Sequence, residues 1–263
     1  MIKISQYLNT QKIGNFIDNL KTGGSIMDWL IQGKKSVIVA CDVNSLDKLS
    51  QLAFATATVP GIGGYKIGLE LVMRFGMTQV VKCIRQYSKE PIIYDHQKGA
   101  TDIPDLGLKF AKAAKEGGVD AVILFPFGGR KTEQEWIKAC HSEGLKVLVG
   151  GHMTQPEFLE EEGGFIADGG PSAMYHIASE NEVRDFVVPG NKTAFVEKYR
   201  GLLESWLGIG NFALYAPGFI KQGGNISDTG EVAGERWHAI VGSAIYKAED
   251  IHKAALEVTS QIT

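Results

Sequence analysis

Charged side chains follow three short apolar runs in the first half of the chain, and their types suit acid–base chemistry. Asp42 follows VIVAC, Lys66 follows GGY, and Asp95 and Lys98 follow PIIY. When carboxylates alternate with ammonium groups, each lysine keeps its proton because of its carboxylate neighbours, and no metal is needed to hold the charges. Such an array presents a fixed field to an anionic substrate and keeps a lysine proton ready for donation.

Two glycine-rich segments near the C-terminus are candidates for phosphate binding. They are Gln222-Gly223-Gly224 and Gly242-Ser243. Backbone N–H groups after the last two strands of a parallel barrel often bind phosphate. The same glycines would also suit plain tight turns, so both interpretations stay open. The chain has no GxxxxGK[ST] segment, which argues against a nucleoside-triphosphate loop.

The histidines lack the spacing of metal ligands. His152 has no second histidine or carboxylate at ligand spacing, so a role in lining a pocket or a loop is favoured, and His96 is interpreted in the same way. His176 and His238 are expected to be structural. The sequence contains no GxSxG, HExxH or CxxC motif.

The composition is that of an ordinary globular domain, with 44% apolar and 22% charged residues among 263. A net charge of −3 without blocks of like charge argues against a nucleic-acid partner or a membrane surface. No apolar run reaches the ~18 residues of a membrane span, and the first residues lack a signal-peptide pattern. Three cysteines without metal or redox spacing suggest a cytoplasmic protein.

The elements that must position these residues alternate along the chain. Eight short apolar runs predict strands at Ser36–Cys41, Gly63–Ile67, Pro91–Tyr94, Ala121–Phe125, Lys146–Val149, Asp185–Val188, Phe212–Tyr215 and Ala239–Val241. Near-continuous apolar strands separated by helices indicate parallel strands that are buried on both faces. Eight such units predict a (β/α)8 TIM barrel, and an open doubly wound sheet is the alternative.

Helical spacing lies between the predicted strands and also before the first of them. The predicted helices are Leu46–Thr56, Leu69–Tyr87, Asp105–Lys115, Lys131–Ser142, Pro171–Ser179, Thr193–Leu207 and Asp250–Ile262, with one or two turns at Thr229–Arg236. Residues 1–35 are expected to form an N-terminal helical extension and residues 36–263 the barrel domain. The charged residues then converge on one mouth, because all strands end on the same face.

The motifs at these strand ends resemble those of the orotidine 5′-monophosphate decarboxylase family, in the decarboxylase/aldolase barrel superfamily. The similarity runs from about Ser36 to the C-terminus, and the motifs agree in order, spacing and strand placement. They are IVACDV, GYKIG, IIYDHQKGATDIP, HMTQP, VVPGNK, APGFIKQGG and IVGSAIY. The resemblance implies a (β/α)8 barrel without metal or organic cofactor, whose site is completed across a homodimer.

Matched residue by residue, the resemblance implies roles at the reacting end of the site. Asp42 and Lys66 would bind ribose hydroxyls, and Lys66 would also join the charge array. Asp95 would face the scissile carboxylate, and Lys98 would protonate the carbon left behind. Thr154 would contact the pyrimidine edge.

Further roles follow for the subunit contact and the phosphate. Asp102 would reach into the active site of the partner subunit. Gln222 and the Gly242 N–H would hold the phosphate, and Pro217 and Gly223 belong to the same substrate-binding segments.

Two departures from the family pattern affect these assignments. The family has D-x-K-x-x-D, whereas Asp95, Lys98 and Asp102 are spaced D-x-x-K-x-x-x-D, which a small bulge would accommodate. Ser243 stands where the family has a phosphate-binding arginine. Lys221 would supply the missing charge as a point charge rather than a bidentate fork.

The resemblance predicts a carboxy-lyase that converts orotidine 5′-monophosphate to uridine 5′-monophosphate and CO2 in pyrimidine biosynthesis. A sugar-phosphate aldolase or decarboxylase of the same superfamily and a catalytically silent nucleotide-binding barrel are the alternatives. Those sugar-phosphate enzymes normally bind Mg2+ through the aspartate and a neighbouring acidic residue. Lys66 stands where they commonly carry a metal-linked glutamate, which favours the decarboxylase.

Overall fold

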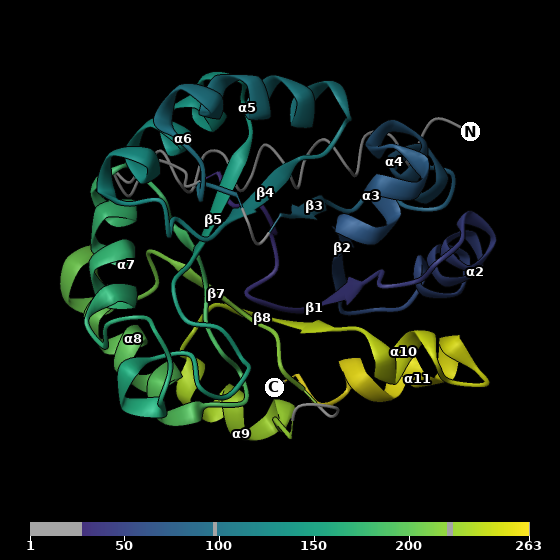
Figure 1. The fold of residues 1–263 in the computed structure, drawn as a ribbon. Helices are drawn as coiled ribbons and strands as arrows, with labels where there is room; N and C mark the ends of the chain where they lie inside the picture. The colour runs from purple at the N-terminus through teal and green to yellow at the C-terminus, as the bar shows by residue number, and fades with distance from the viewer. Residues whose placement is uncertain (1–27, 97–98, 220–222, 263) are drawn as a thin grey trace, which may run out of the picture. The chain divides into compact units, whose positions relative to one another are not determined.

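Eight parallel strands close into a barrel in the computed structural model, which describes residues 28–96, 99–219 and 223–262. The strands are β1 (Lys35–Ala40), β2 (Ile62–Gly68), β3 (Ile92–Asp95), β4 (Ala121–Leu124), β5 (Lys146–Gly150), β6 (Asp185–Val187), β7 (Ala213–Ala216) and β8 (Trp237–Val241). Each strand pairs with its neighbours in sequence, and β8 closes the barrel on β1. Figure 1 looks into this ring of strands, with the helices outside it. The predicted (β/α)8 barrel is confirmed, and the open sheet is wrong.

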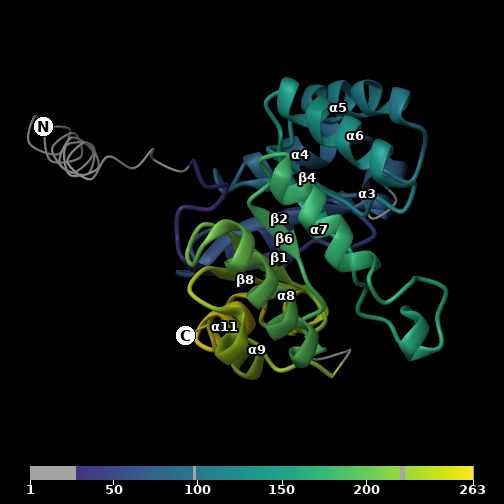
Figure 2. The same cartoon turned by 90° about the vertical axis from the view of Figure 1, so that its left-hand side faces the viewer.

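The helices that cover the barrel follow the predicted order. They are α2 (Leu46–Thr56), α3 (Leu69–Phe75), α4 (Met77–Arg85), α5 (Gly107–Glu116), α6 (Arg130–Ser142), α7 (Gly170–Glu180), α8 (Thr193–Leu207), α9 (Ile226–Ala233), α10 (Ser243–Tyr246) and α11 (Ile251–Thr259). Short 3-10 turns are added at Pro104–Leu106 and Glu160–Glu162. Figure 2 shows the segment that leads into α7 extending away from the strands.

One predicted helix is divided in two. The spacing from Leu69 to Tyr87 predicts one continuous helix, but α3 ends and α4 begins at Gly76. Gly76 has φ 76°, a left-handed conformation that glycine adopts without steric cost and that ends a helix. The Gly76 N–H donates to the Val72 carbonyl and satisfies the last turn of α3.

Alternate residues along each strand face the helices and the barrel interior. Val37 and Val39 of β1 belong to the apolar core between strands and helices, as do Tyr65 and Ile67 of β2. Because side chains alternate across a strand, Lys66 faces the barrel interior. The core between the two layers therefore holds the strands in place, and the interior that Lys66 enters also contains apolar strand residues such as Ile123 and Ile240.

The N-terminal boundary of the barrel unit lies at Ile31. Arg236 donates to the carbonyls of Ile31 (3.2 Å) and Gly33 (3.0 Å), and the Trp237 N–H donates to the Lys34 carbonyl (2.9 Å). The predicted helical extension over residues 1–35 lies mostly outside the described residues, and residues 28–34 are not helical. Within the described part of the chain, no helix is both long and apolar enough to cross a membrane.

Candidate active site

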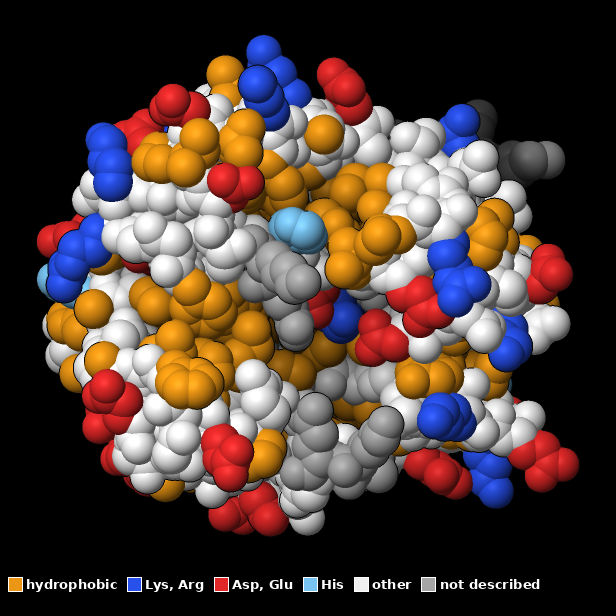
Figure 3. Space-filling model, viewed as in Figure 1, with side chains coloured by type: hydrophobic (Ala, Val, Ile, Leu, Met, Phe, Trp, Pro, Cys, Tyr) orange, Lys and Arg blue, Asp and Glu red, His pale blue; other side chains and the backbone are white. Residues whose placement is uncertain are grey.

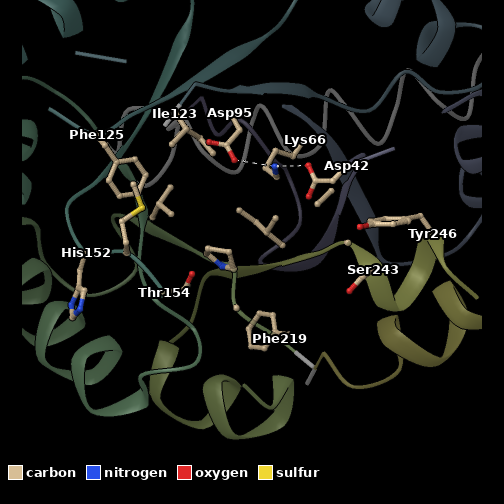
Figure 4. Close-up of a pocket in the computed structure, with 17 residues that line it drawn as sticks. Asp42, Lys66, Asp95, Ile123, Phe125, His152, Thr154, Phe219, Ser243 and Tyr246 are labelled. Atoms are coloured by element: carbon tan, nitrogen blue, oxygen red, sulfur yellow. Dashed lines mark hydrogen bonds and ion pairs between the residues drawn. The ribbon is translucent and has the colours of Figure 1, made fainter. Parts of the chain in front are cut away.

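A cavity of about 300 Å3 lies at the carboxyl ends of the strands. The predicted site residues that line it are Asp42, Lys66, Asp95, Thr154, Pro217, Gly242 and Ser243. Figure 3 shows a hollow near the centre of this face, with acidic and basic side chains together beside apolar ones. Figure 4 shows Asp42, Lys66, Asp95, Thr154 and Ser243 around this cavity, each from the end of a different strand or the segment that follows it. The barrel therefore brings together residues that are up to 201 positions apart in the chain (243 − 42).

Lys66 is the centre of a charge array at the ends of the first three strands. Its Nζ lies 2.9 Å from Asp95 Oδ2 and 3.3 Å from Asp42 Oδ1. The side chains of Lys66 and Asp95 are 10% and 9% exposed, whereas that of Asp42 is 52% exposed. The array is thus closed toward the barrel interior and open to a ligand on the Asp42 side.

The two carboxylates keep Lys66 charged although it is buried. Burial alone would lower the pKa of its ammonium group, but the charges and hydrogen bonds of Asp95 and Asp42 raise that pKa above its ordinary value. Lys66 is therefore a permanent cation rather than a general base at neutral pH. The Oδ1 atom of Asp95 is buried and has no hydrogen-bond partner among the described residues.

An apolar wall lies beside the charge array. Ile123 lies in β4 and Phe125 directly follows it, whereas Met153 follows β5 and Phe219 follows β7. Gly150 leaves the space that the Phe125 ring occupies, since a Cβ there would overlap the ring. This wall suits the flat face of a heterocycle, and the cavity volume lies at the lower end of small-molecule sites.

Described residues on either side of the motif's lysine contact one another and the end of β4. The Gly99 N–H donates to the His96 carbonyl (2.6 Å), and the Phe125 N–H donates to the Gly99 carbonyl (3.0 Å). Ala100 has φ 65°, and its carbonyl accepts from Gly128 (3.2 Å). The described residues on the C-terminal side of the motif's lysine are therefore fixed to the end of β4.

Asp102 lies away from the cavity of its own chain. It is exposed, and its carboxylate accepts from the Ile103 N–H at 2.7 Å. Its carbonyl accepts from the Thr132 hydroxyl at 3.0 Å, and Trp136 Nε1 donates to the Ile103 carbonyl at 3.1 Å. Helix α6 thus presents the Asp102 carboxylate on the surface.

Three predicted residues, Lys98, Lys221 and Gln222, lie outside the described residues. Gly223 is described, but it is exposed and is absent from the cavity lining. Gly242 and Ser243 line the cavity where α10 begins, next to Tyr246.

Comparison with known proteins gives the family. The model of the "Orotidine 5'-phosphate decarboxylase / HUMPS family" matches residues 35–258. The chain belongs to this family. It is 30% identical over 236 residues to orotidine 5′-phosphate decarboxylase of Methanosarcina barkeri, covering 88% of this chain and 96% of that one. The Pyrococcus abyssi protein of the same name is 27% identical over 228 residues. That match covers 86% of this chain and 98% of the Pyrococcus abyssi protein.

Solved structures in the family share the fold. Orotidine 5′-monophosphate decarboxylase from Methanocaldococcus jannaschii, complexed with the inhibitor BMP, superposes with a TM-score of 0.76 at 22% identity. That match covers 88% of this chain and all of the other. The Pyrococcus horikoshii orotidine 5′-phosphate decarboxylase superposes with a TM-score of 0.71 at 24% identity. That match covers 86% of this chain and 98% of the other.

In this chain, the acidic residue after β2 does not line the active-site cavity. Glu70 pairs with Arg74 at 3.1 Å on the exposed side of α3 and is absent from the cavity lining. In the part of the chain that the structure describes, no group of three or more His, Cys, Asp or Glu side chains could hold a metal ion.

Several lining residues were not identified from the sequence. Phe125, Phe219 and Tyr246 line the cavity; Phe125 ends a predicted strand, and Phe219 and Tyr246 stand in the APGFIKQGG and IVGSAIY motifs, but nothing in these patterns separates a cavity-lining ring from a core aromatic. His152 lines it as expected, and its buried ring also contacts Lys192. Lys192 is the last residue of the VVPGNK motif, and this motif is the sequence feature that could have identified it as a site residue.

Proposed function

We propose that this protein decarboxylates orotidine 5′-monophosphate to uridine 5′-monophosphate and CO2, as a cofactor-independent carboxy-lyase of pyrimidine biosynthesis. The observation that carries the proposal is the Asp42–Lys66–Asp95 array, with Lys66 and Asp95 buried, inside a barrel of this family. Relatives named orotidine 5′-phosphate decarboxylase, at 25–30% identity over most of the chain, support it.

The geometry supports different roles for the two carboxylates of the array, since Asp42 is exposed and Asp95 is buried. The exposed Asp42 carboxylate, held by Lys66, would accept hydrogen bonds from ribose hydroxyls. The buried Asp95 carboxylate would face the substrate carboxylate, and placing like charges together favours loss of CO2 over retention. The pair of electrons left on the ring carbon would be stabilised by the fixed ammonium charges. Lys98 would donate the proton that completes the product.

Binding of the base and the phosphate is part of the same proposal. The apolar wall formed by Ile123 and Phe125 would hold the ring, and Thr154 would contact the pyrimidine edge. Gly242, Ser243 and the segment from Lys221 would hold the phosphate. Energy from phosphate binding would then be used to organise the loops around the base.

A homodimer would complete the site. The exposed Asp102 carboxylate, outside the cavity of its own chain, is available to a facing subunit. We infer a cytoplasmic enzyme, and the three cysteines, all free thiols, support a reducing compartment.

The test is the loss of orotidine-ring absorbance when purified protein is added, with and without EDTA. Equal rates in both conditions are expected. Metal-dependent turnover of a hexulose phosphate, without loss of orotidine absorbance, would point to the sugar-phosphate branch. Binding of uridine 5′-monophosphate without any turnover would identify a silent barrel.

A further inference from the structure

A largely buried ion cluster joins the loop after β5 to the segment after β6. We call its three residues, His152, Glu162 and Lys192, the clasp. Lys192 Nζ lies 2.9 Å from His152 Nε2 and 3.2 Å from the Gln155 carbonyl, and it pairs with Glu162 Oε1. The His152 side chain is fully buried, and those of Lys192 and Glu162 are 14% and 18% exposed. One ammonium group therefore contacts three positions along the loop.

The clasp fixes the tautomer of His152. An ammonium group can only donate, so Nε2 must accept, and the ring proton is left on Nδ1. Nδ1 lies 2.9 Å from the hydroxyl of Tyr199 on α8, which then accepts. Burial and the charge of Lys192 lower the pKa of His152 to about 4, so the ring is neutral at physiological pH. Nε2 and Glu162 Oε2, 3.4 Å apart, are then both acceptors and lie together only because Lys192 bridges them.

The loop that the clasp holds is an internally bonded body. Glu162 accepts from the N–H groups of Leu159 (3.1 Å) and Phe158 (3.3 Å). Glu160 and Phe158 exchange backbone hydrogen bonds with Ile166, at 2.8 and 3.2 Å. Burial would raise the pKa of Glu162, but Lys192 and the Leu159 N–H lower it to about 2 overall. The loop therefore stays anchored by an ionised carboxylate.

The anchored loop supplies one wall of the active-site cavity. His152, Met153 and Thr154 are consecutive and all line it, and Figure 4 shows His152 and Thr154 on one side of the cavity. Asn191, next to Lys192, donates to the Thr154 carbonyl at 3.0 Å. The end of β6 thus sets the position of Thr154 through two adjacent residues.

From these contacts we propose that Lys192 is a positioning residue, which holds the loop after β5 so that Thr154 faces the bound base. The proposal rests on the proposed function for the identity of the ligand. Glu162 is its partner in the same role. A misplacement of about 1 Å can cost ~10²-fold in rate, so a residue outside direct contact with the reacting atoms can control the site.

The test compares Lys192→Met and Glu162→Gln with Lys192→Arg. Lys192→Met should raise KM for orotidine 5′-monophosphate and Kd for uridine 5′-monophosphate by about 10- to 100-fold, and Lys192→Arg should recover most of the loss. Lys198→Met is the matched control, because Lys198 is on α8, which begins directly after Lys192, and its ammonium lies 5.6 Å from the Phe195 ring centre. A purely structural role would lower the active fraction, and hence kcat, without changing KM or Kd.

Two measurements keep the proposal independent of the reaction. Nitrogen NMR of the wild type should show His152 as the neutral Nδ1–H tautomer, and Lys192→Met should raise its pKa. Amide hydrogen exchange at residues 152–162 should become faster in Lys192→Met but not in Lys198→Met. An Nε2–H tautomer, or unchanged exchange and unchanged Kd in Lys192→Met, would overturn the proposal. A wild type that shows the expected tautomer and exchange but neither binds nor turns over the nucleotide would instead overturn the proposed function.

Discussion

Lys66 Nζ lies 2.9 Å from Asp95 Oδ2, and this contact joins two strands of the barrel at its mouth. Lys66 is opposite Ala40 of β1 and Ile93 of β3 in the strand register, so its side chain emerges between the ends of both neighbours. The contact is therefore set by the barrel register rather than by a flexible loop. Preorganisation of this kind lets a fixed charge act without rearrangement during the reaction.

Lys66→Met should remove the central cation and nearly abolish turnover. Loss of one preorganised electrostatic group typically costs about 10²–10³-fold in kcat. Breaking a buried ion pair also leaves a carboxylate uncompensated, which typically destabilises a protein by about 3–5 kcal/mol. Steady-state kinetics and denaturant unfolding measure the two effects, with Lys48→Met on α2 as the surface control. Retention of more than a tenth of wild-type kcat would contradict the assigned role.

Lys221→Ala should weaken binding of phosphorylated ligands, because Ser243 replaces the family's arginine. Loss of one charged hydrogen bond costs ~1.5–3 kcal/mol, or about 10- to 150-fold in Kd. Uridine, which lacks the phosphate, should bind the variant and the wild type almost equally. Titration of uridine and uridine 5′-monophosphate into both proteins separates the effects. Equal losses for both ligands, or no loss for either, would show that Lys221 does not bind the phosphate.

Asp102 is predicted to act in the partner subunit. Lys98→Ala and Asp102→Ala should each be inactive, and their mixture should regain activity because a hybrid dimer has one intact site. Random exchange would restore about a quarter of the sites. Rates after denaturation and refolding of the mixture measure this recovery. No recovery despite hybrid dimers seen by native mass spectrometry would show that Asp102 acts in its own chain.

Glu133 should make stability depend on pH. It is 1% exposed in the first turn of α6, Oε1 has no hydrogen-bond partner within the described residues, and burial raises its pKa to about 8. The folded state therefore keeps a proton that the unfolded state loses near pH 4.5. Between those values the free energy of unfolding falls as pH rises, by about 1.4 kcal/mol per pH unit.

Glu133→Gln tests this dependence, since the amide has the same shape and stays neutral. The variant should gain stability over the wild type as pH rises from about 5 to about 8. Urea unfolding across this range measures the difference. Parallel pH profiles for the two proteins would mean that Glu133 is already ionised in the folded state. Glu135→Gln, at a half-exposed site of the same helix, is the control, because the hydrogen bond and charge of Lys131 lower the pKa of Glu135 and it stays ionised across this range.

Much of the fold could be predicted from the sequence, because the barrel depends on patterns that repeat. Each apolar run became a strand, and α2 and α8 have the predicted bounds. The break at Gly76 was missed because apolar spacing continues across it. Helix α10 was missed because its four residues are too few for a period to be seen.

The polar half of the site was predictable for the same reason. Asp42, Lys66 and Asp95 end consecutive strands, so topology alone brings them together. The clasp was not predictable, since Glu162 and Lys192 are 30 positions apart and meet only through the irregular loop after β5. Phe125 and Phe219 differ from core aromatics only in their position at the mouth.

The most direct test of the proposed metal-independent decarboxylation follows orotidine 5′-monophosphate by NMR in D2O with EDTA present. The expected product is uridine 5′-monophosphate with one deuterium at C6. The donating ammonium group exchanges its protons with D2O, so the new bond at C6 receives a deuteron. Lys66→Met should form the same product about 10²-fold more slowly or worse. Two results would contradict the proposed function. In the first, the substrate stays intact with wild-type protein; in the second, it is decarboxylated only after Mg2+ is restored.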